Sequence, residues 1–323
     1  MCEVAAQRSR PILAIVVPCY NEAPLIVDTA RKLVEILEEL SSHGEIDNQS
    51  FIYFVDDGSQ DETWLKICHL HQMNPQKIKG LKLARNFGSQ SAILAGILSV
   101  RERAHCAITI DADLQQDERA IPLFLKSYKR GAEIVFGVRC DRSADSFWKK
   151  STALIFYKCM KAMGVRIIEN HADYRLISRK VIDSLAEFRE YNLFLRGIFA
   201  DLGFKTETVY FKAGRRQIGE TKFSFKKMAS LALNGITSFS VMPLRLISIL
   251  GAGIFIFSCV MSIWILFKAL FGKVVPGWAS TLIPIYILGG LQIMLLGILG
   301  EYIGRIYKEV KARPRFIKDI ELF

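Results

Sequence analysis

The chain lacks the glycine-rich motifs that mark the common nucleotide-binding folds. No GxGxxG follows the first apolar run, and no GxxxxGK[ST] occurs among the 323 residues. These absences exclude a dinucleotide-binding turn and a P-loop as the means of holding phosphate groups. One GxG is present, Gly251-Ala252-Gly253, but it lies inside a long apolar run and is not a phosphate loop.

Sulfur and imidazole ligands for a metal ion are also scarce. The seven cysteines are scattered without a CxxC pair, and no cysteine–histidine group has zinc-ligand spacing. We expect reduced thiols that face a cytosol. The 43 Lys and Arg outnumber the 32 Asp and Glu, for a formal net charge of +11. This excess favours an anionic partner, either nucleic acid, a phosphorylated substrate or an anionic lipid.

Charged residues are missing from two long stretches of the C-terminal third. Neither 246–267 nor 274–300 contains Asp, Glu, Lys or Arg, and each exceeds the roughly 20 residues that a bilayer span requires. They predict a membrane hairpin of two transmembrane helices, about 246–267 and 276–300. Lysines and arginines gather before the first run and after the second. The positive-inside rule therefore predicts a multi-pass protein with both termini in the cytoplasm.

The same patterns divide the rest of the chain. Residues 10–215 are expected to form a cytoplasmic domain, and residues 301–323 a basic cytoplasmic tail. Residues 216–245 mix apolar side chains with lysines, which favours a juxtamembrane amphipathic connector. An ordinary connecting helix is the alternative. No signal peptide is evident, since the first apolar run, 12–18, follows a polar start.

Apolar runs alternate with helical patterns in the first two thirds of the chain. Strands are expected at 12–17, 51–55, 78–83, 106–110 and 133–137, and helices at 25–40, 62–73, 90–100 and 121–130. Continuously apolar strands that alternate with helices predict an α/β fold with a mostly parallel sheet covered on both faces.

Polar motifs follow these strands where each strand ends. They are PCYNE (18–22), VDDGS (55–59), ARNFG (84–88), DADLQ (111–115) and GVR (137–139). In such folds ligands bind at the carboxyl ends of the strands, so we expect one shared crevice. Asp111 and Asp113 would repel each other there unless a cation lay between them or open water surrounded them.

Together these motifs resemble glycosyltransferase family 2, of the GT-A fold. Downstream, ADYRLISRKV (172–181), GETKFSF (219–225) and GEYIGRIYKEVKARP (300–314) resemble the polyprenyl-phosphate glycosyltransferases. That branch includes bactoprenol glucosyltransferases and dolichyl-phosphate mannose synthases. The resemblance implies inverting transfer of one sugar, from a nucleotide-sugar to undecaprenyl phosphate or a similar polyprenyl phosphate. UDP-glucose is the first choice of donor, followed by UDP-GlcNAc or another hexose donor.

The resemblance also implies roles for individual residues. Asp111, Asp113 and Gln115 would form a site for Mg²⁺ or Mn²⁺, with Asp113 the most direct ligand and Asp111 either in contact with the nucleotide or bound to the metal through water. Pro18, Tyr20 and Glu22 match the nucleoside pocket, where Asp56 suits a base N–H and Asp57 supports the turn. The remaining substrate-binding candidates are cationic: Arg85, Arg139, Arg175, Arg215 and Lys222.

Asp173 occupies the place of the family's candidate catalytic carboxylate. A phosphate acceptor is already ionised at neutral pH, so Asp173 either acts as a base or orients the acceptor or sugar. A salt bridge to Arg175 is the structural alternative. Relatives often carry NFGKE where this chain has Asn86-Phe87-Gly88-Ser89-Gln90, so a lysine near the donor is missing.

Other functions compete with this one. A processive polysaccharide synthase would need a QxxRW motif, which is absent. A non-catalytic membrane protein that binds sugar nucleotides would be expected to have a broken DxD, but the motif is intact. Nucleic-acid binding is disfavoured because the cations gather beside the apolar runs, where a lipid headgroup explains them better. We expect the protein to reside in the bacterial cytoplasmic membrane. The resemblance also implies a homo-oligomer, most closely a tetramer.

Overall fold

The computed structural model describes residues 8–140, 171–188, 195–211 and 278–323, with scattered positions between 249 and 267. The chain forms two compact units. The first unit contains the sheet and its helices, including residues 314–323 from the C-terminal end. The second contains most of the C-terminal third. The predicted residues Arg215 and Lys222, and the connector 216–245, lie outside the described residues.

The first unit has the alternating elements that the periodicity predicts. Its strands are β1 (Leu13–Cys19), β2 (Phe51–Asp56), β3 (Ile78–Leu83), β4 (Cys106–Thr109), β5 (Ile134–Arg139), β6 (His171–Ser178), β7 (Thr206–Phe211) and β8 (Lys318–Leu322). Its helices are α2 (Ile26–Ser42), α3 (Thr63–Met73), α4 (Ser89–Ser99), α5 (Ile121–Lys129), α7 (Arg179–Glu187) and α8 (Leu195–Asp201), with a 3-10 turn at Glu118–Ala120. Predicted and observed ends differ by no more than two residues over the first five strands.

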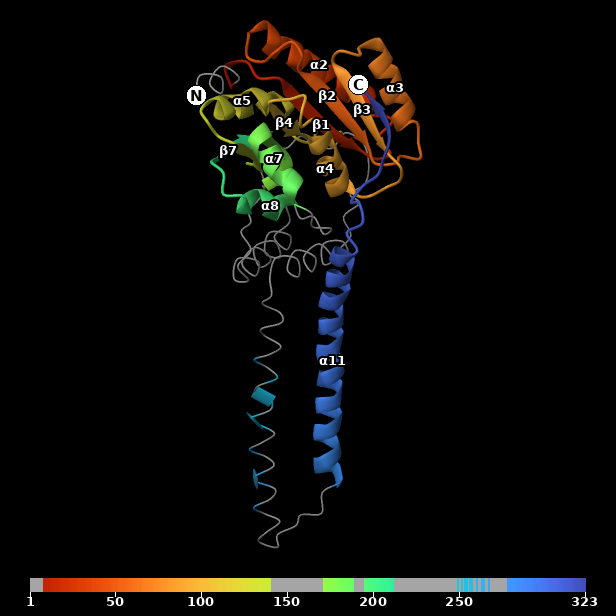
Figure 1. The fold of residues 1–323 in the computed structure, drawn as a ribbon, viewed down its shortest axis with the longest axis vertical. Helices are drawn as coiled ribbons and strands as arrows, with labels where there is room; N and C mark the ends of the chain where they lie inside the picture. The colour runs from red at the N-terminus through yellow and green to blue at the C-terminus, as the bar shows by residue number, and fades with distance from the viewer. Residues whose placement is uncertain are drawn as a thin grey trace. The chain divides into compact units, whose positions relative to one another are not determined.

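The described strands form one sheet in the order β7-β5-β6-β4-β1-β2-β3-β8 (Figure 1). Strands β4, β1, β2 and β3 are parallel neighbours, and β5 is parallel to β7. β6 is antiparallel to both β4 and β5, and β8 is antiparallel to β3. The mostly parallel α/β sheet is therefore confirmed, with two antiparallel strands that the periodicity did not predict.

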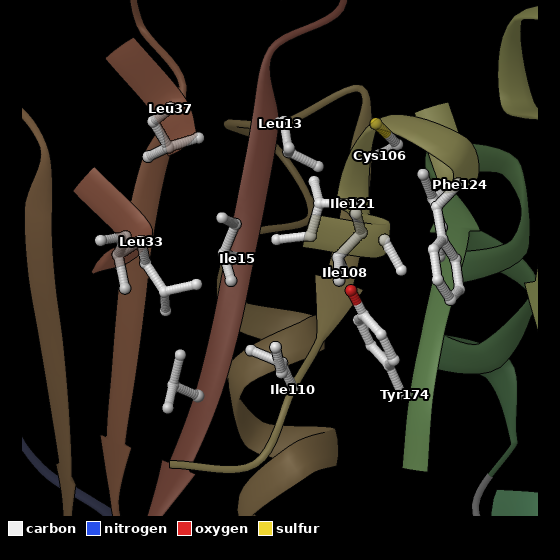
Figure 2. Packing of buried hydrophobic residues seen from close by; sticks show 14 of the residues in the cluster. Leu13, Ile15, Leu33, Leu37, Cys106, Ile108, Ile110, Ile121, Phe124 and Tyr174 are labelled. Atoms are coloured by element: carbon white, nitrogen blue, oxygen red, sulfur yellow. The ribbon is translucent and has the colours of Figure 1, made fainter. Parts of the chain in front are cut away.

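Helices cover both faces of this sheet. Figure 2 shows Leu13 and Ile15 of β1 among side chains of the core, with Leu33 of α2 and Phe124 of α5. On the other face, Gly96 of α4 packs so closely on β1 and β2 that an added Cβ would lie 2.4 Å from a Val16 methyl. The alternation of β1 side chains thus serves two apolar layers, which is why its sequence reads as continuously hydrophobic.

The C-terminal segment differs from the expected tail. Helix α11 runs from Trp278 to Val310, so it continues past the predicted end of the second span at 300. Residues Lys318–Leu322 then form β8 and pair with β3, from Gly80↔Leu322 to Leu83↔Lys318. The predicted basic tail therefore includes an edge strand of the sheet of the first unit.

Among the residues that the structure describes, no helix combines the length and the apolarity that a membrane crossing needs.

Candidate functional site

The topology gathers the carboxyl ends of the parallel strands at one edge of the sheet. β6 adds to this edge from the opposite direction, since an antiparallel strand has its amino end there. Thr109 at the end of β4 pairs with Arg175, which places Asp173, two residues earlier, beside the loop that follows β4. Asp173 is distant from the DADLQ motif in sequence, and only the pairing of β4 with β6 brings it there.

A cleft of about 270 Å³ opens at this edge. The loops after β1, β2, β3 and β4 and the first turns of α4 line it. The described residues in its wall are Pro18, Cys19, Tyr20, Glu22, Asp57, Asn86, Gly88, Ser89, Ala92, Asp111, Ala112 and Asp113. Six of the predicted site residues therefore share one cavity: Pro18, Tyr20, Glu22, Asp57, Asp111 and Asp113.

Hydrogen bonds tie the loop after β1 to the loop after β2. Asn21 has a φ of 55°, a left-handed conformation that asparagine tolerates better than most residues. Its backbone N–H donates to Ser59 Oγ at 2.9 Å, and its side-chain oxygen accepts from the Gln60 N–H at 2.9 Å. The Glu22 N–H donates to Thr63 Oγ1 at 2.9 Å. These bonds fix the backbone on both sides of Asn21, and so the positions of Tyr20 and Glu22 in the cleft wall.

Asp57 braces the loop after β3. Its carboxylate accepts hydrogen bonds from the backbone N–H groups of Phe87, at 2.7 Å, and Gly88, at 2.9 Å. The expected support of a turn is thus present, although the turn that Asp57 holds belongs to the next loop. Burial raises the pKa of Asp57 above its ordinary value, and the two backbone donors oppose that shift.

Asp56 is not among the described residues that line the cleft. It is fully buried, and its carboxylate accepts from the Ser59 N–H at 3.2 Å. Burial raises the pKa of this carboxyl group as well. The observed contact is therefore with the protein's own turn, and the predicted contact of Asp56 with a nucleotide base stays a prediction.

The DADLQ segment forms a tight turn that presents Asp111 and Asp113 to the cleft. The Leu114 N–H donates to the Asp111 carbonyl at 3.2 Å, and the Gln115 N–H donates to Asp113 Oδ1 at 3.2 Å. Gln115 itself is not in the described cleft wall. The side chain of Gln116, which is fully buried, does contact Asp111.

Asp111 and Asp113 fit a hard divalent cation such as Mg²⁺ or Mn²⁺. Such a cation is usually held by one or two carboxylates and completed by substrate phosphates and water. Over the described ranges, no group of three or more His, Cys, Asp or Glu side chains forms a metal cage. Two carboxylates on one turn, open to a cleft, are the donor set that a metal shared with a substrate requires.

Asp173 is held from several sides. Its backbone carbonyl accepts from Thr109 Oγ1 at 2.7 Å, and its carboxylate accepts from Gln90 Nε2 of α4 at 3.4 Å. The carboxylate also forms an ion pair with Arg175. Arg175 has no exposed side-chain surface and its guanidinium lies 4.8 Å from the centre of the Phe199 ring. The contacts of Arg175 thus include Asp173 and the Phe199 ring, and the alternative of a salt bridge is present.

Two further cationic candidates, Arg85 and Arg139, are among the described residues, and neither is in the described cleft wall. Arg85 is exposed, lies 4.2 Å over the Phe87 ring and donates to the Asn86 carbonyl at 3.3 Å. Arg139 ends β5, which is separated from β4 by β6, and it is not in the described cleft wall. Neither position contradicts a role in phosphate binding, and neither brings the guanidinium to Asp111.

Sequence reasoning missed two parts of the site. Ser89 and Ala92 of α4 form part of the cleft wall because Asp57 fixes the start of that helix. The resemblance placed position 89 near the donor but predicted no role for the serine found there, and Ala92 gave no signal of its own. Gln116 was also missed, because two adjacent glutamines follow the DAD motif and sequence alone gives no means of choosing between them.

The sequence family described as Glycosyl transferase family 2 matches residues 14–186, which include both the cleft and Asp173. A chain from Bacillus subtilis named "Uncharacterized glycosyltransferase YkoT" is 46% identical over 98% of this chain and 94% of its own length. A "Prophage bactoprenol glucosyl transferase homolog" from Escherichia coli is 39% identical over 94% of this chain and 97% of its own. The "Bactoprenol glucosyl transferase" of Shigella phage SfX is 38% identical over 94% of this chain and 98% of its own length.

Proposed function

The chain belongs to glycosyl transferase family 2 and is a glycosyltransferase with a GT-A-like α/β fold. We propose that it transfers one glucose from UDP-glucose to a polyprenyl phosphate, undecaprenyl phosphate in a bacterium, with inversion at the anomeric carbon. The names of the relatives at 38% and 39% identity support the sugar and the lipid. UDP-GlcNAc and other hexose donors are the next candidates.

The observation that carries this proposal is the shared cleft. Glu22, Asp57, Asp111 and Asp113 come from three separate strand ends and meet around one cavity. A nucleotide-sugar has a nucleoside with hydrogen-bonding groups at one end and two phosphates at the other. Tyr20 and Glu22 suit the nucleoside, since a carboxylate accepts from ribose hydroxyls. Asp111 and Asp113 suit the phosphates through a divalent cation.

Asp111 and Asp113 would hold Mg²⁺ or Mn²⁺, with Gln115 as the further ligand expected from the sequence. Such an ion, when bound, neutralises charge on the departing nucleoside diphosphate. The bond that forms joins an acceptor phosphate oxygen to the anomeric carbon. The bond that breaks joins that carbon to the β-phosphate of UDP, which leaves with the electron pair.

Asp173 is assigned an orienting role in this reaction. A phosphate monoester has its second pKa at about 6 and is ionised at neutral pH, so its attack requires no proton removal. The Asp173 carboxylate is fixed by Gln90 and Arg175, and it stands beside the loop that bears Asp111 and Asp113. A carboxylate held in this way can accept from sugar hydroxyls and set the angle at which the anomeric carbon meets the acceptor.

We further propose that the apolar runs 246–267 and 276–300 hold the enzyme in the bacterial cytoplasmic membrane. Both termini and the catalytic domain would face the cytoplasm, where nucleotide-sugars are found. Arg139, Arg215 and Lys222 are then the candidates for contact with the lipid phosphate, and Arg85 for contact with the donor. Labelling of single cysteines placed at the two ends and in the 268–273 loop, in intact and permeabilised cells, tests this orientation.

A transfer assay tests the reaction. Purified full-length protein in detergent is incubated with undecaprenyl phosphate, Mn²⁺ or Mg²⁺, and each of a panel of radiolabelled UDP- and GDP-sugars. We expect label from UDP-glucose in the lipid fraction, and its loss in Asp113→Ala. Label from a different donor alone would correct the sugar. Release of free sugar without lipid product would contradict the acceptor, and binding of donors without turnover would contradict the proposed activity.

A further inference from the structure

Gln116 contacts both the backbone and the side chain of Asp111. Its Oε1 accepts from the Asp111 N–H at 3.0 Å, and its Nε2 donates to Asp111 Oδ2 at 2.5 Å. The Gln116 side chain is fully buried, whereas Asp111 opens onto the cleft. The amide therefore lies behind the carboxylate, on the side away from the substrate.

The chemistry of these two contacts allows only one orientation of the amide. A backbone N–H can only donate, so the group that faces it must be the amide oxygen. An ionised carboxylate can only accept, so the group that faces it must be the NH₂. No other uncharged side chain of this length offers an acceptor and a donor side by side. The two hydrogen bonds together fix the plane of the Asp111 carboxylate relative to the backbone of the same residue.

The turn in front of Gln116 is constrained at other points too. Leu114 has a φ of 46°, which is unfavourable for a side chain of its size. Thr29 of α2, which is buried, donates its hydroxyl to the Ala112 carbonyl at 2.7 Å. The turn therefore keeps an unfavourable backbone conformation because neighbouring elements hold it in place. Such conformations persist at sites where the surrounding structure determines them.

We propose that Gln116 is a positioning residue for the metal-binding carboxylate of this enzyme. It holds Asp111 in one orientation before the metal and the donor arrive, so that binding does not have to order the carboxylate. Partners of metal-binding carboxylates commonly change metal affinity by about 10- to 100-fold when they are removed. The inference rests on the proposed function, because it assumes that Asp111 serves a metal–nucleotide complex.

The test compares Gln116→Met with a control that loses a similar buried contact elsewhere. Methionine keeps the length and the buried volume but removes both hydrogen bonds to Asp111. Ser50 is also fully buried, and its Oγ accepts from the Leu13 N–H at 3.0 Å, at the amino end of β1 and far from the cleft. Ser50→Ala thus also leaves a buried backbone N–H without its acceptor. Calorimetric titration with UDP at several Mn²⁺ concentrations measures binding, and thermal melting measures stability.

We expect both variants to melt at lower temperature than the wild type. Only Gln116→Met should need about 10-fold more Mn²⁺ to reach half-maximal UDP binding. If Gln116→Met fails to fold, Gln116→Asn replaces it, since the shortened amide cannot keep both contacts. An unchanged Mn²⁺ requirement in the folded variant, or an equal rise in Ser50→Ala, overturns the inference.

The lipid-transfer assay on the wild type separates this inference from the proposed function. Mn²⁺-dependent UDP binding that weakens in Gln116→Met supports the positioning role even if undecaprenyl phosphate is not the acceptor. Wild-type protein that transfers sugar but binds UDP equally well without a divalent cation overturns the positioning role and leaves the transfer reaction standing.

Discussion

At the scale of single residues, the ion pair of Asp173 and Arg175 makes a carboxylate rigid at the edge of a cleft. Arg175 is buried between Asp173 and the Phe199 ring, so its guanidinium has little freedom to follow a moving partner. An arginine in this position holds its partner in a planar, directional geometry that lysine would not reproduce. Asp173 is therefore suited to orienting a substrate.

Asp173→Asn tests this assignment, because it keeps the size of the side chain and removes its charge. We expect sugar transfer to fall by about 100-fold, since small errors of alignment have effects of that order. UDP binding should stay within about 2-fold, because Asp173 is outside the described cleft wall. Asp183→Asn is the control, since Asp183 pairs with Arg101 at 2.6 Å on the surface. Transfer by Asp173→Asn at the wild-type rate would contradict the orienting role.

The buried carboxyl group of Asp56 should make the stability of the protein depend on pH. Burial raises its pKa in the folded protein, so above a pH of about 4 the unfolded chain loses this proton first. The stabilising contribution of Asp56 is therefore complete at low pH and is lost as the pH rises through its folded pKa. The amide introduced by Asp56→Asn cannot ionise, so the stability of this variant does not fall with rising pH on account of position 56.

Melting temperatures of both proteins between about pH 4 and pH 7 measure the difference. We expect the variant to be least stable relative to the wild type at the acidic end, and to gain on it as the pH rises. The charge of Asp56 also contributes to the raised pKa of the adjacent Asp57, so Asp56→Asn lessens the loss of stability from Asp57 as well, and both effects favour the variant as the pH rises. If the variant instead gained stability relative to the wild type as the pH fell, the sign of the Asp56 pKa shift would be wrong.

At the scale of elements, the turn after β2 and the loop after β3 meet at Gly58. Gly58 has a φ of 66°, and a Cβ there would lie 2.5 Å from the carbonyl carbon of Arg85. The two loops are in backbone contact, and Asp57 completes the junction from the cleft side. Any side chain at position 58 would push the Asn86–Gly88 wall away from the rest of the cleft.

Gly58→Ala should therefore destabilise the protein by about 3 kcal/mol, from a left-handed backbone and a clash with backbone atoms. Gly44→Ala provides the matched control, because Gly44 has a φ of 71° but nothing within 4 Å of an added Cβ. It should cost only ~1 kcal/mol. Denaturant unfolding of both variants measures these values. Equal losses would show that the contact with Arg85 contributes nothing beyond the backbone conformation.

At the scale of the whole molecule, the C-terminal end of the chain completes the catalytic sheet. Tyr53 of β2 donates to Glu321 of β8 at 2.8 Å, and the Phe323 ring packs on those of Phe51 and Tyr53 at 5.6 and 5.5 Å. The guanidinium of Arg103 lies 3.3 Å over the Phe323 ring. β8 thus covers the edge of β3, which would otherwise expose unpaired backbone groups.

Removal of residues 318–323 should lower the melting temperature of the full-length protein by about 5–10 °C and promote its aggregation. Lys318→Ala is the control, because Lys318 is 41% exposed and pairs only at the surface with Glu321, at 3.4 Å, among its described contacts. Thermal melting and light scattering check both variants. A truncated chain that melts with the wild type would mean that β8 is dispensable for the sheet.

The sequence by itself predicted the local parts of this protein. The short apolar runs of the first two thirds of the chain predicted buried strands, and the polar motifs that follow them were expected to meet at one edge because parallel strands end there. Pro18, Tyr20, Glu22, Asp57, Asp111 and Asp113 share a cleft for this reason. The family followed from the same motifs, because each is short, contiguous and fixed in its order along the chain.

Only the tertiary structure decided the contacts that join distant segments. The register of β4 on β6 brought Asp173 to the DADLQ turn, and burial turned Arg175 inward. The buried position of Gln116, and not that of the adjacent Gln115, brings an amide into contact with Asp111. Strand β8 pairs with a sheet whose other described strands all lie before residue 212. These outcomes depend on which surfaces exclude water together after the chain folds, and no periodicity within one segment contains that information.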